Sequence, residues 1–147
     1  MGSTFFTLHY HLVFSTKDRR ALIRDDWRPR LHSYLGGVIR GMNGVALSIG
    51  GVDDHVHLLA SLRPVHRIAD VLRDLKRDST NWVKEHFDER FSWQEGYAAF
   101  TVSPSATNSV RNYIANQEEH HRKFSFVDEL KELLEKAGIN YDGKYLL

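Results

Sequence analysis

The alternation of apolar and polar residues near the start of the chain predicts a β-strand. In FFTLHYHLVFS (5–15) every second residue is apolar, and these residues would share one face: Phe6, Leu8, Tyr10, Leu12 and Phe14. Further strands are expected over VALSIGGV (45–52), HVHLLASL (55–62) and YAAFTVS (97–103). Only Asp53 and Asp54 separate the second strand from the third, which predicts an antiparallel hairpin.

Between these strands, apolar residues recur at helical spacing. A first helix is expected from about residue 25, with Gly44 able to close its end, and a second from about residue 66 to 86. A third helix, opening at residues 103–105, carries Tyr113 and Gln117. Ser125 is expected to cap a shorter fourth helix that Gly138 stops.

The predicted order β-α-β-β-α-β, followed by helices, indicates the α+β class. With right-handed crossovers, this order builds a four-stranded antiparallel sheet with two helices on one face, a ferredoxin-like sandwich. The sequence contains no repeat or Pro/Gly-rich linker, so we expect residues 1–147 to form one domain. The last helix and the GKYLL tail are additions, expected to dock on the body or on a partner subunit.

The amino-acid composition of the chain excludes several kinds of site. The chain has 147 residues, 41% of them hydrophobic, and no cysteine. Disulfides, thiolate nucleophiles and sulfur-ligated zinc are therefore excluded. No apolar run approaches the roughly 18 residues that a membrane span needs, and the first residues lack the layout of a secretory signal. The sequence predicts a cytoplasmic protein.

Positive charge is concentrated near the start of the chain. The first 44 residues hold seven Lys or Arg and three Asp or Glu. A basic segment can contact phosphates, although a solvated loop has the same composition. The candidate DNA contacts in this segment are Arg19, Arg20 and Arg24. Further candidates on the second predicted helix are Arg73, Lys76 and Arg77. Acidic residues alternate with these three, so an ordinary solvated helix face explains them equally well.

A pair of histidines lies in the otherwise apolar third strand. His55 and His57 are two residues apart, so both project from the same face of the strand. Two imidazoles placed in this way can bind a divalent metal ion. Asp54 would act either as a further ligand or as a hydrogen-bond partner of a ligating histidine. The alternative is a pair of buried histidines satisfied by backbone groups. His9 and His11 repeat the same spacing in the first strand, so spacing alone does not decide.

Tyr113 and Gln117 lie four residues apart, on one face of the third predicted helix. A half-buried core tyrosine and a surface glutamine would give the same pattern. If they adjoin the histidine pair, however, the imidazoles and the amide oxygen can hold a metal ion beside the tyrosine. The tyrosine oxygen can then attack a phosphodiester, forming a covalent phosphotyrosine. The adjacent His120 and His121 are expected at a solvated helix end.

At this point the chain resembles the HUH-type single-tyrosine transposases of small insertion sequences, the IS200-like group. The pattern His55-Val56-His57 is followed on a later helix by Tyr113 and Gln117. Four blocks resemble the family in the same order: YHLVFSTKDRR (10–20), DDHVHLLASL (53–62), WQEGYAAFTVS (93–103) and YIANQEEHHRKFSF (113–126). The likeness covers nearly the whole chain.

The resemblance implies a DNA transposase that cuts and rejoins single-stranded DNA at insertion-sequence ends. By position, His55, His57 and Gln117 would bind Mg²⁺ or Mn²⁺, and Tyr113 would become linked to the 5′ phosphate. Family members recognise subterminal hairpins and act as homodimers, in which the tyrosine helix of one subunit can complete the site of the other. Ala98 departs from the glycine expected there. His9 and His11 have no matched catalytic position and are assigned to packing or to a DNA contact.

Two other functions stay open at this stage. A non-catalytic or host-adopted protein on the same fold would bind hairpin or single-stranded DNA without forming a covalent adduct. A metal-dependent hydrolase of small phosphates would leave Tyr113 without a role and would favour more carboxylate ligands.

Overall fold

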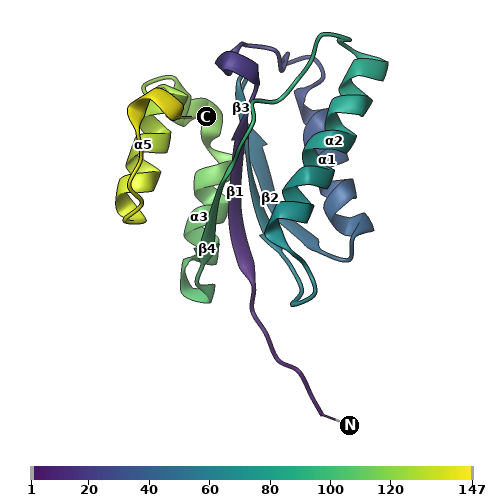
Figure 1. Cartoon of the computed structure of the whole chain (residues 1–147), viewed down its shortest axis with the longest axis vertical. Helices are drawn as coiled ribbons and strands as arrows, with labels where there is room; N and C mark the ends of the chain where they lie inside the picture. The colour runs from purple at the N-terminus through teal and green to yellow at the C-terminus, as the bar shows by residue number, and fades with distance from the viewer. Residues whose placement is uncertain (1, 147) are drawn as a thin grey trace.

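The computed structural model describes residues 2–146 and contains a four-stranded antiparallel sheet with strand order β2-β3-β1-β4 (Figure 1). The strands are β1 (His9–Ser15), β2 (Val45–Gly51), β3 (His55–Ser61) and β4 (Ala98–Val102). The hairpin of β2 and β3 forms as expected, and β1 pairs between β3 and β4. This order confirms the ferredoxin-like prediction.

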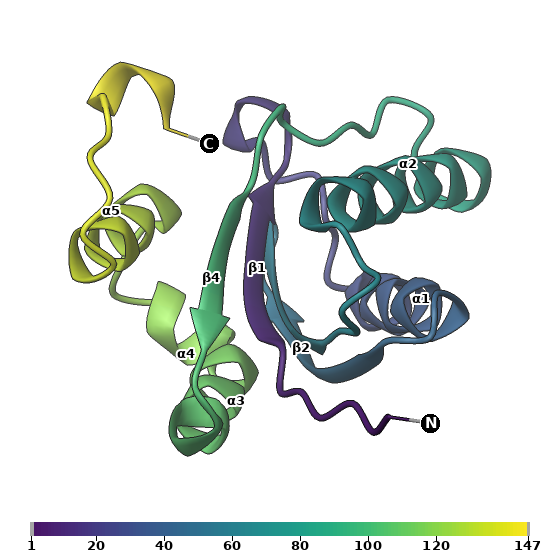
Figure 2. The same ribbon diagram turned by 60° about the horizontal axis from the view of Figure 1, so that its bottom comes forward.

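One face of the sheet is covered by the helices α1 (Arg28–Gly41) and α2 (Ile68–His86) (Figure 2). The larger apolar core lies between these helices and the sheet. Leu12 and Phe14 of β1 and Val56 and Leu58 of β3 all point into it and are fully buried. The alternating pattern of the two central strands thus places their other residues, the histidines among them, on the opposite face.

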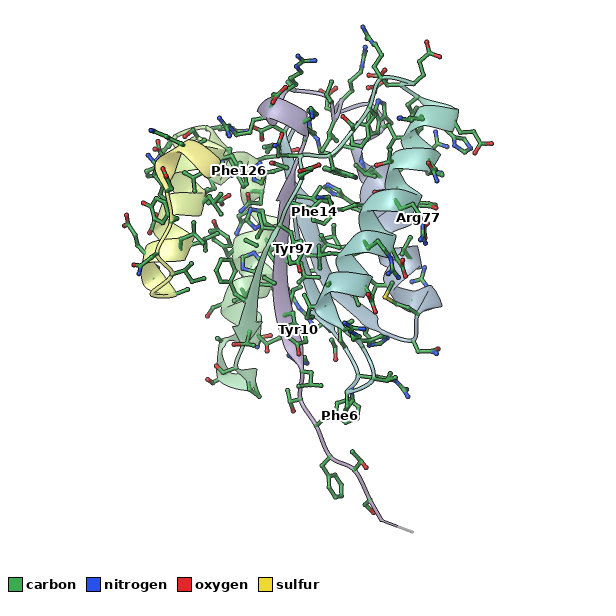
Figure 3. All side chains as sticks on the ribbon, in the orientation of Figure 1. Phe6, Tyr10, Phe14, Arg77, Tyr97 and Phe126 are labelled. Carbon is green, nitrogen blue, oxygen red and sulfur yellow. The ribbon has the colours of Figure 1, made fainter. Side chains whose placement is uncertain are left out.

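The opposite face is covered by α3 (Thr107–Ala115), α4 (Gln117–His121) and α5 (Phe126–Lys136) (Figure 2). The fourth predicted helix, α5, docks on the body of the same chain. Its Phe126, Leu130 and Leu134 pack against Val13 of β1 and Ala98 of β4. Phe126 and Phe14 consequently lie on opposite sides of the sheet (Figure 3). Ser125 caps α5, because its hydroxyl accepts a hydrogen bond from the backbone N–H of Asp128.

Short 3-10 turns complete the described elements: η1 (Lys17–Arg19), η2 (Pro104–Ala106) and η3 (Gly143–Tyr145). Three expectations need correction. Phe6 lies outside β1, in an extended arm, and is 48% exposed. The left-handed residue after α1 is Asn43, with φ 67°, and not Gly44. The third predicted helix is two helices, because Asn116, with φ −102° and ψ 24°, interrupts it between Tyr113 and Gln117.

The tyrosine-bearing helix approaches the sheet at a glycine. A Cβ added to Gly50 of β2 would overlap the carbonyl oxygen of Ile114 in α3 and lie 3.0 Å from its carbonyl carbon. Only the missing side chain lets the two backbones come this close. Gly50 therefore fixes how far α3 stands from the strand that neighbours β3. Within the described residues, no helix is both long enough and apolar enough to cross a membrane.

Candidate metal and tyrosine site

The site is built on β3, where His55 and His57 are fully buried. Both imidazoles lie on the face of the sheet covered by α3, α4 and α5, while Val56 enters the core beneath α1 and α2. The two rings stand 5.0 Å apart between centroids at an interplanar angle of 77°. This strand geometry brings two nitrogen donors to one point without any help from a loop.

Gln117 reaches this point from the start of α4. Its side-chain oxygen lies 3.1 Å from Nε2 of His55 and 2.9 Å from Nε2 of His121, one turn further along α4. Glu129 reaches the same point from α5, and its Oε1 lies 2.9 Å from Nε2 of His57 and 3.1 Å from Nε2 of His121. Two helices, α4 and α5, thus converge on the histidine pair of β3.

Tyr113 of α3 stands beside the pair. Its ring meets the ring of His57 edge-on, with centroids 5.7 Å apart. The phenolic O–H donates a hydrogen bond to Oε2 of Glu129. Burial and the neighbouring Glu129 carboxylate both raise the pKa of Tyr113 above its usual value of 10.0, since each disfavours a phenolate. The hydroxyl is therefore protonated in the metal-free protein.

Two further groups orient the histidines from behind. Oδ1 of Asp54 lies 2.7 Å from Nδ1 of His55, which leaves Nε2 of His55 facing the cluster. Nδ1 of His57 lies 2.7 Å from Nε2 of His11 on the neighbouring strand. Because Glu129 can only accept, the Nε2 of His57 carries the proton and its Nδ1 accepts from His11. A carboxylate bonded to the second ring nitrogen, as Asp54 is to His55, fixes the orientation of a metal-binding imidazole.

The charges of the metal-free cluster balance internally. Burial opposes ionisation of Glu129, but hydrogen bonds from His121, His55 and His57 outweigh it and hold the pKa of the carboxyl far below its usual range. Burial likewise disfavours a charged His55, yet its bonds to Asp54 and Glu129 raise its pKa to about 9. Burial lowers the pKa of His57 to about 4. The resting site therefore pairs a carboxylate with an imidazolium, and a cation can take the proton's place.

The donor set fits a metal ion. The candidate ligand atoms of His55, His57, His121 and Glu129 all lie within 4.8 Å of one another. Bonds of about 2.1 Å in an octahedral arrangement place ligand atoms roughly 3 to 4.2 Å apart, so small side-chain movements suffice. Imidazole nitrogens, a carboxylate and an amide oxygen are all ordinary ligands of divalent ions. The residues that could hold the ion come from β3, α4 and α5.

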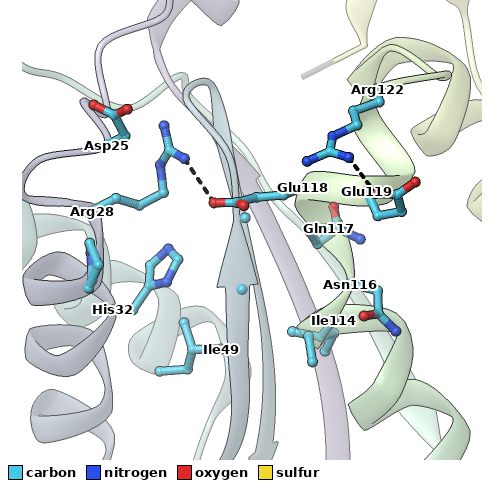
Figure 4. A pocket seen from close by; sticks show the side chains of 14 residues that line it. Asp25, Arg28, His32, Ile49, Ile114, Asn116, Gln117, Glu118, Glu119 and Arg122 are labelled. Atoms are coloured by element: carbon cyan, nitrogen blue, oxygen red, sulfur yellow. Dashed lines mark hydrogen bonds and ion pairs between the residues drawn. The ribbon is translucent and has the colours of Figure 1, made fainter.

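Two cavities flank the cluster. One, of about 290 Å³, lies between α3 and α5 and is lined by Tyr113, Glu129, His11 and His120. The other, of about 400 Å³, lies on the far side of Gln117. It runs over the free edge of β2 and is crossed by an ion pair of 3.6 Å between Arg28 and Glu118 (Figure 4). The first cavity therefore adjoins Tyr113 and its hydrogen-bond partner Glu129.

The basic loop after β1 sits at the same end of the sheet as His55. Thr16 donates its backbone N–H to the carbonyl of Asp54 at 2.8 Å, and Ile23 donates to that of Asp53 at 2.9 Å. The predicted DNA contacts of this loop are Arg19, Arg20 and Arg24. The side chain of Arg20 is 69% exposed and that of Arg24 is 74% exposed, so both can reach a ligand from solvent.

The basic residues of α2 lie on the opposite layer, as the position of Arg77 shows (Figure 3). Arg73 and Arg77 form ion pairs with aspartates of their own helix. The ammonium of Lys76 donates to the backbone carbonyls of Gln94 and Gly96, at 2.6 and 2.8 Å. The structure therefore separates these three residues from the histidine cluster.

Sequence reasoning missed three members of the cluster. His121 was expected at a solvated helix end, but its side chain is 8% exposed, and that of His120 is 24% exposed. The signal for His121 was its spacing, four residues after Gln117 and eight after Tyr113. Glu129 stands between Phe126 and Leu130 on the apolar face of α5, an unusual place for a carboxylate. His11, assigned to packing or a DNA contact, lies against His57.

Comparison with known sequences identifies the family. The chain matches the family described as "Transposase IS200 like" over residues 4–117. It is 28% identical over 122 residues to the ISDra2 transposase TnpA of Deinococcus radiodurans, which covers 78% of this chain and 86% of that protein. It is 26% identical over 129 residues to the transposase for insertion sequence element IS200 of Salmonella typhimurium, covering 83% and 84% of the two chains.

Solved structures agree. A crystal structure of a putative transposase from Deinococcus radiodurans R1 has a TM-score of 0.66 at 26% identity, covering 80% of this chain and 95% of that one. The structure of a REP-associated tyrosine transposase bound to a REP hairpin has a TM-score of 0.62 at 13% identity, over 82% and 74% of the chains, and supports the fold. Because the family match takes in both the histidine pair and Tyr113 with Gln117, the chain belongs to the IS200-like transposase family.

Proposed function

We propose that the chain is a single-domain transposase, residues 1–147, that cleaves single-stranded DNA at insertion-sequence ends and transfers the cut strand through Tyr113. The observation that carries the proposal is the position of the Tyr113 hydroxyl. It lies at the edge of a buried cluster of His55, His57, Gln117 and Glu129, and it opens on the cavity between α3 and α5. A tyrosine that served only packing would not need a buried carboxylate at its oxygen.

The cleavage step balances without a co-reactant. The oxygen of Tyr113 attacks phosphorus, a bond forms between them, and the bond from phosphorus to the 3′ oxygen breaks. In the net step the proton of the Tyr113 hydroxyl is transferred to the departing 3′ oxygen, and Glu129 orients the hydroxyl by its hydrogen bond. The 5′ phosphate stays on Tyr113. Attack by another 3′-OH reverses the step, so strands can be rejoined without ATP.

His55, His57 and Gln117 are the residues proposed to hold a divalent cation, Mg²⁺ or Mn²⁺, with Asp54 orienting His55. Such an ion would supply positive charge to the phosphate oxygens as negative charge builds on them. The other contributions to the reaction come from residues of the chain. Burial excludes water from the imidazoles of His55 and His57, and Glu129 holds the Tyr113 hydroxyl by a hydrogen bond.

The proposed partner is hairpin or single-stranded DNA of the element ends. The REP-associated relative is bound to a hairpin, and the exposed Arg20 and Arg24 border the His55 end of the sheet. Arg19 belongs to the same proposed surface. Arg73, Lys76 and Arg77 form a second proposed contact on the opposite layer.

A homodimer is part of the proposal. In the single chain, Tyr113 lies beside His57 and Gln117 beside His55. The expectation that the tyrosine helix of one subunit completes the site of the other stays a prediction. If two chains exchange α3, new contacts must replace those at Gly50.

The test compares two tyrosines that each donate a hydrogen bond to a glutamate: Tyr113 to Glu129, and the exposed Tyr141 to Glu135. Overlapping labelled single-stranded oligonucleotides from the flanks of the gene are incubated with Mn²⁺ and run on a denaturing gel. Wild type and Tyr141→Phe should give a protein–DNA band, and Tyr113→Phe should give none while still binding DNA. A band from Tyr113→Phe would remove the tyrosine mechanism. Hairpin binding without any band from wild type would favour the non-catalytic alternative.

A further inference from the structure

Glu129 is a buried carboxylate with no arginine or lysine among its ion-pair partners in the described part of the chain. It is 2% exposed, and its partners are the imidazoles of His55, His57, His120 and His121. Burying a carboxylate costs several kcal/mol unless strong partners replace water. In the metal-free site the partner that carries positive charge is the imidazolium of His55, and a dication bound to Glu129 would replace that charge. A carboxylate buried on an otherwise apolar helix face is stabilised by a bound cation, which offsets the free-energy cost of burying its charge.

The two oxygens of Glu129 face different groups. Oε1 lies 2.9, 3.1 and 3.3 Å from the Nε2 atoms of His57, His121 and His55. Oε2 accepts from the Tyr113 hydroxyl and, at 3.1 Å, from the amide of Gln117. Oε1 is therefore surrounded by three imidazoles, and Oε2 contacts the hydroxyl of Tyr113, the proposed nucleophile.

We infer that Glu129 and His121 are metal ligands, so that the site is a three-histidine, one-carboxylate centre, and that it selects a transition-metal dication over Mg²⁺. This inference rests on the proposed function for the identity of the site. It adds a carboxylate and a third imidazole to His55, His57 and the amide oxygen of Gln117, the ligands expected from the sequence. Through its second oxygen, Glu129 also ties the position of Tyr113 to the ion.

The types of ligand atom determine which metal ion the site prefers. Mg²⁺ prefers oxygen ligands in a strict octahedron and retains several waters. Imidazole nitrogens suit Mn²⁺ less well than Co²⁺ or Zn²⁺, but all three bind nitrogen more strongly than Mg²⁺ does. Three buried Nε2 atoms with one anionic oxygen are therefore a poor magnesium site. They form a good site for a transition ion.

The helix that supplies Glu129 is held to the sheet by a small apolar cluster. Phe126 stacks on His55, with centroids 4.2 Å apart and planes 24° apart, and Leu130 packs against Val13. If Glu129 ligates the ion, metal binding fastens α5 to β3. Because a ligand bound only to the folded state stabilises it by mass action, the melting temperature must rise with metal concentration.

The test uses chelator-stripped full-length protein titrated with MnCl₂, with free Mn²⁺ followed by electron paramagnetic resonance, and with MgCl₂ by calorimetry. Wild type should bind one Mn²⁺ per chain at least 100-fold more tightly than Mg²⁺. Glu129→Gln keeps the side-chain shape and should weaken Mn²⁺ binding at least tenfold, as should His121→Asn. Glu132→Gln is the matched control, since Glu132 is an exposed residue of α5 paired with Lys136, and it should bind Mn²⁺ as wild type does.

Equal Mn²⁺ affinity in wild type and folded Glu129→Gln would overturn the inference, and so would equal affinity of wild type for Mg²⁺ and Mn²⁺. Circular dichroism of the metal-free variants checks folding. If Glu129→Gln does not fold, a crystal of the wild type grown with Mn²⁺ decides: anomalous density bonded to Glu129 supports the inference, and density bonded to other residues alone refutes it. Tyr113→Phe separates the two proposals, because it should bind Mn²⁺ normally and form no adduct. Tight Mn²⁺ binding by a wild type that makes no adduct would refute the proposed function and leave the metal centre standing.

Discussion

Gly50 controls the distance between the tyrosine helix and the sheet. Replacing it with alanine adds a methyl group that overlaps the carbonyl oxygen of Ile114 and also approaches its Cγ2 to 3.1 Å. Neither the strand backbone of β2 nor the helix backbone of α3 can rotate out of the way. The Gly50→Ala protein must therefore move α3 outward as a unit, and Tyr113 moves with it.

The size of the effect follows from that geometry. Relieving the overlap needs a displacement on the order of 1 Å, and overpacking of this kind costs about 1–3 kcal/mol of folding free energy. A misplacement of about 1 Å at a reacting group lowers the rate roughly 100-fold. Gly50→Ala should therefore stay folded, melt at a lower temperature and form the covalent DNA adduct about 100-fold more slowly than wild type.

Gly36 provides the matched control. It lies in α1, on the other side of β2, and a Cβ there would meet Ile49 Cδ1 at 3.5 Å, an ordinary contact. Gly36→Ala should leave the adduct rate unchanged and stabilise the protein by about 0.4–1 kcal/mol, as a compatible helix site allows. The measurements are urea unfolding and the initial rate of adduct formation with Mn²⁺. A wild-type adduct rate in Gly50→Ala would refute the view that this contact positions Tyr113.

Three further predictions concern stability, each measured by urea unfolding. Ser125→Ala removes the cap of α5 and should cost about 1 kcal/mol, whereas Ser125→Asp should restore it; no loss in the alanine variant would contradict the cap. Lys76→Met removes two hydrogen bonds to the segment before β4 and should cost about 1–3 kcal/mol; an unchanged stability would show that the ammonium is free. Burial and the nearby Arg28 lower the pKa of His32 to about 4, so between pH 6.5 and 4 the unfolded chain binds a proton that the folded chain does not, and stability is lost as pH falls. Wild type should lose about 2 kcal/mol more than His32→Gln between pH 7 and 5, and parallel pH profiles would refute this.

The alternating sequence pattern predicted the sheet because the two faces of its central strands pack against different helices. Alternation located Leu12 and Phe14, and the two-residue turn located the hairpin. It failed at Phe6, because β1 pairs with both neighbours only from His9 onward. The pairing with the β3 side ends at the carbonyl of Leu8, which accepts from the backbone N–H of Leu62 at 2.9 Å, and Phe6 lies before the paired residues.

The site was predictable to the extent that its residues share one local element. His55 and His57 share β3, and the four-residue spacing of Tyr113 and Gln117 survives the break at Asn116. Glu129 was not predictable as a partner, because only the docking of α5 through Phe126 brings it to the histidines. A carboxylate on the apolar side of an amphipathic helix was the available sign.

The most direct test of the central claim is to identify the residue that becomes linked to DNA. The adduct formed with Mn²⁺ is digested with nuclease and trypsin, and the peptides are analysed by mass spectrometry. Cleavage after Arg111 and Arg122 yields NYIANQEEHHR (112–122), in which Tyr113 is the sole hydroxyl-bearing residue. We predict a nucleotide mass on this peptide through a phosphotyrosine. A nucleotide on any other peptide, or no modified peptide from active protein, would contradict the account.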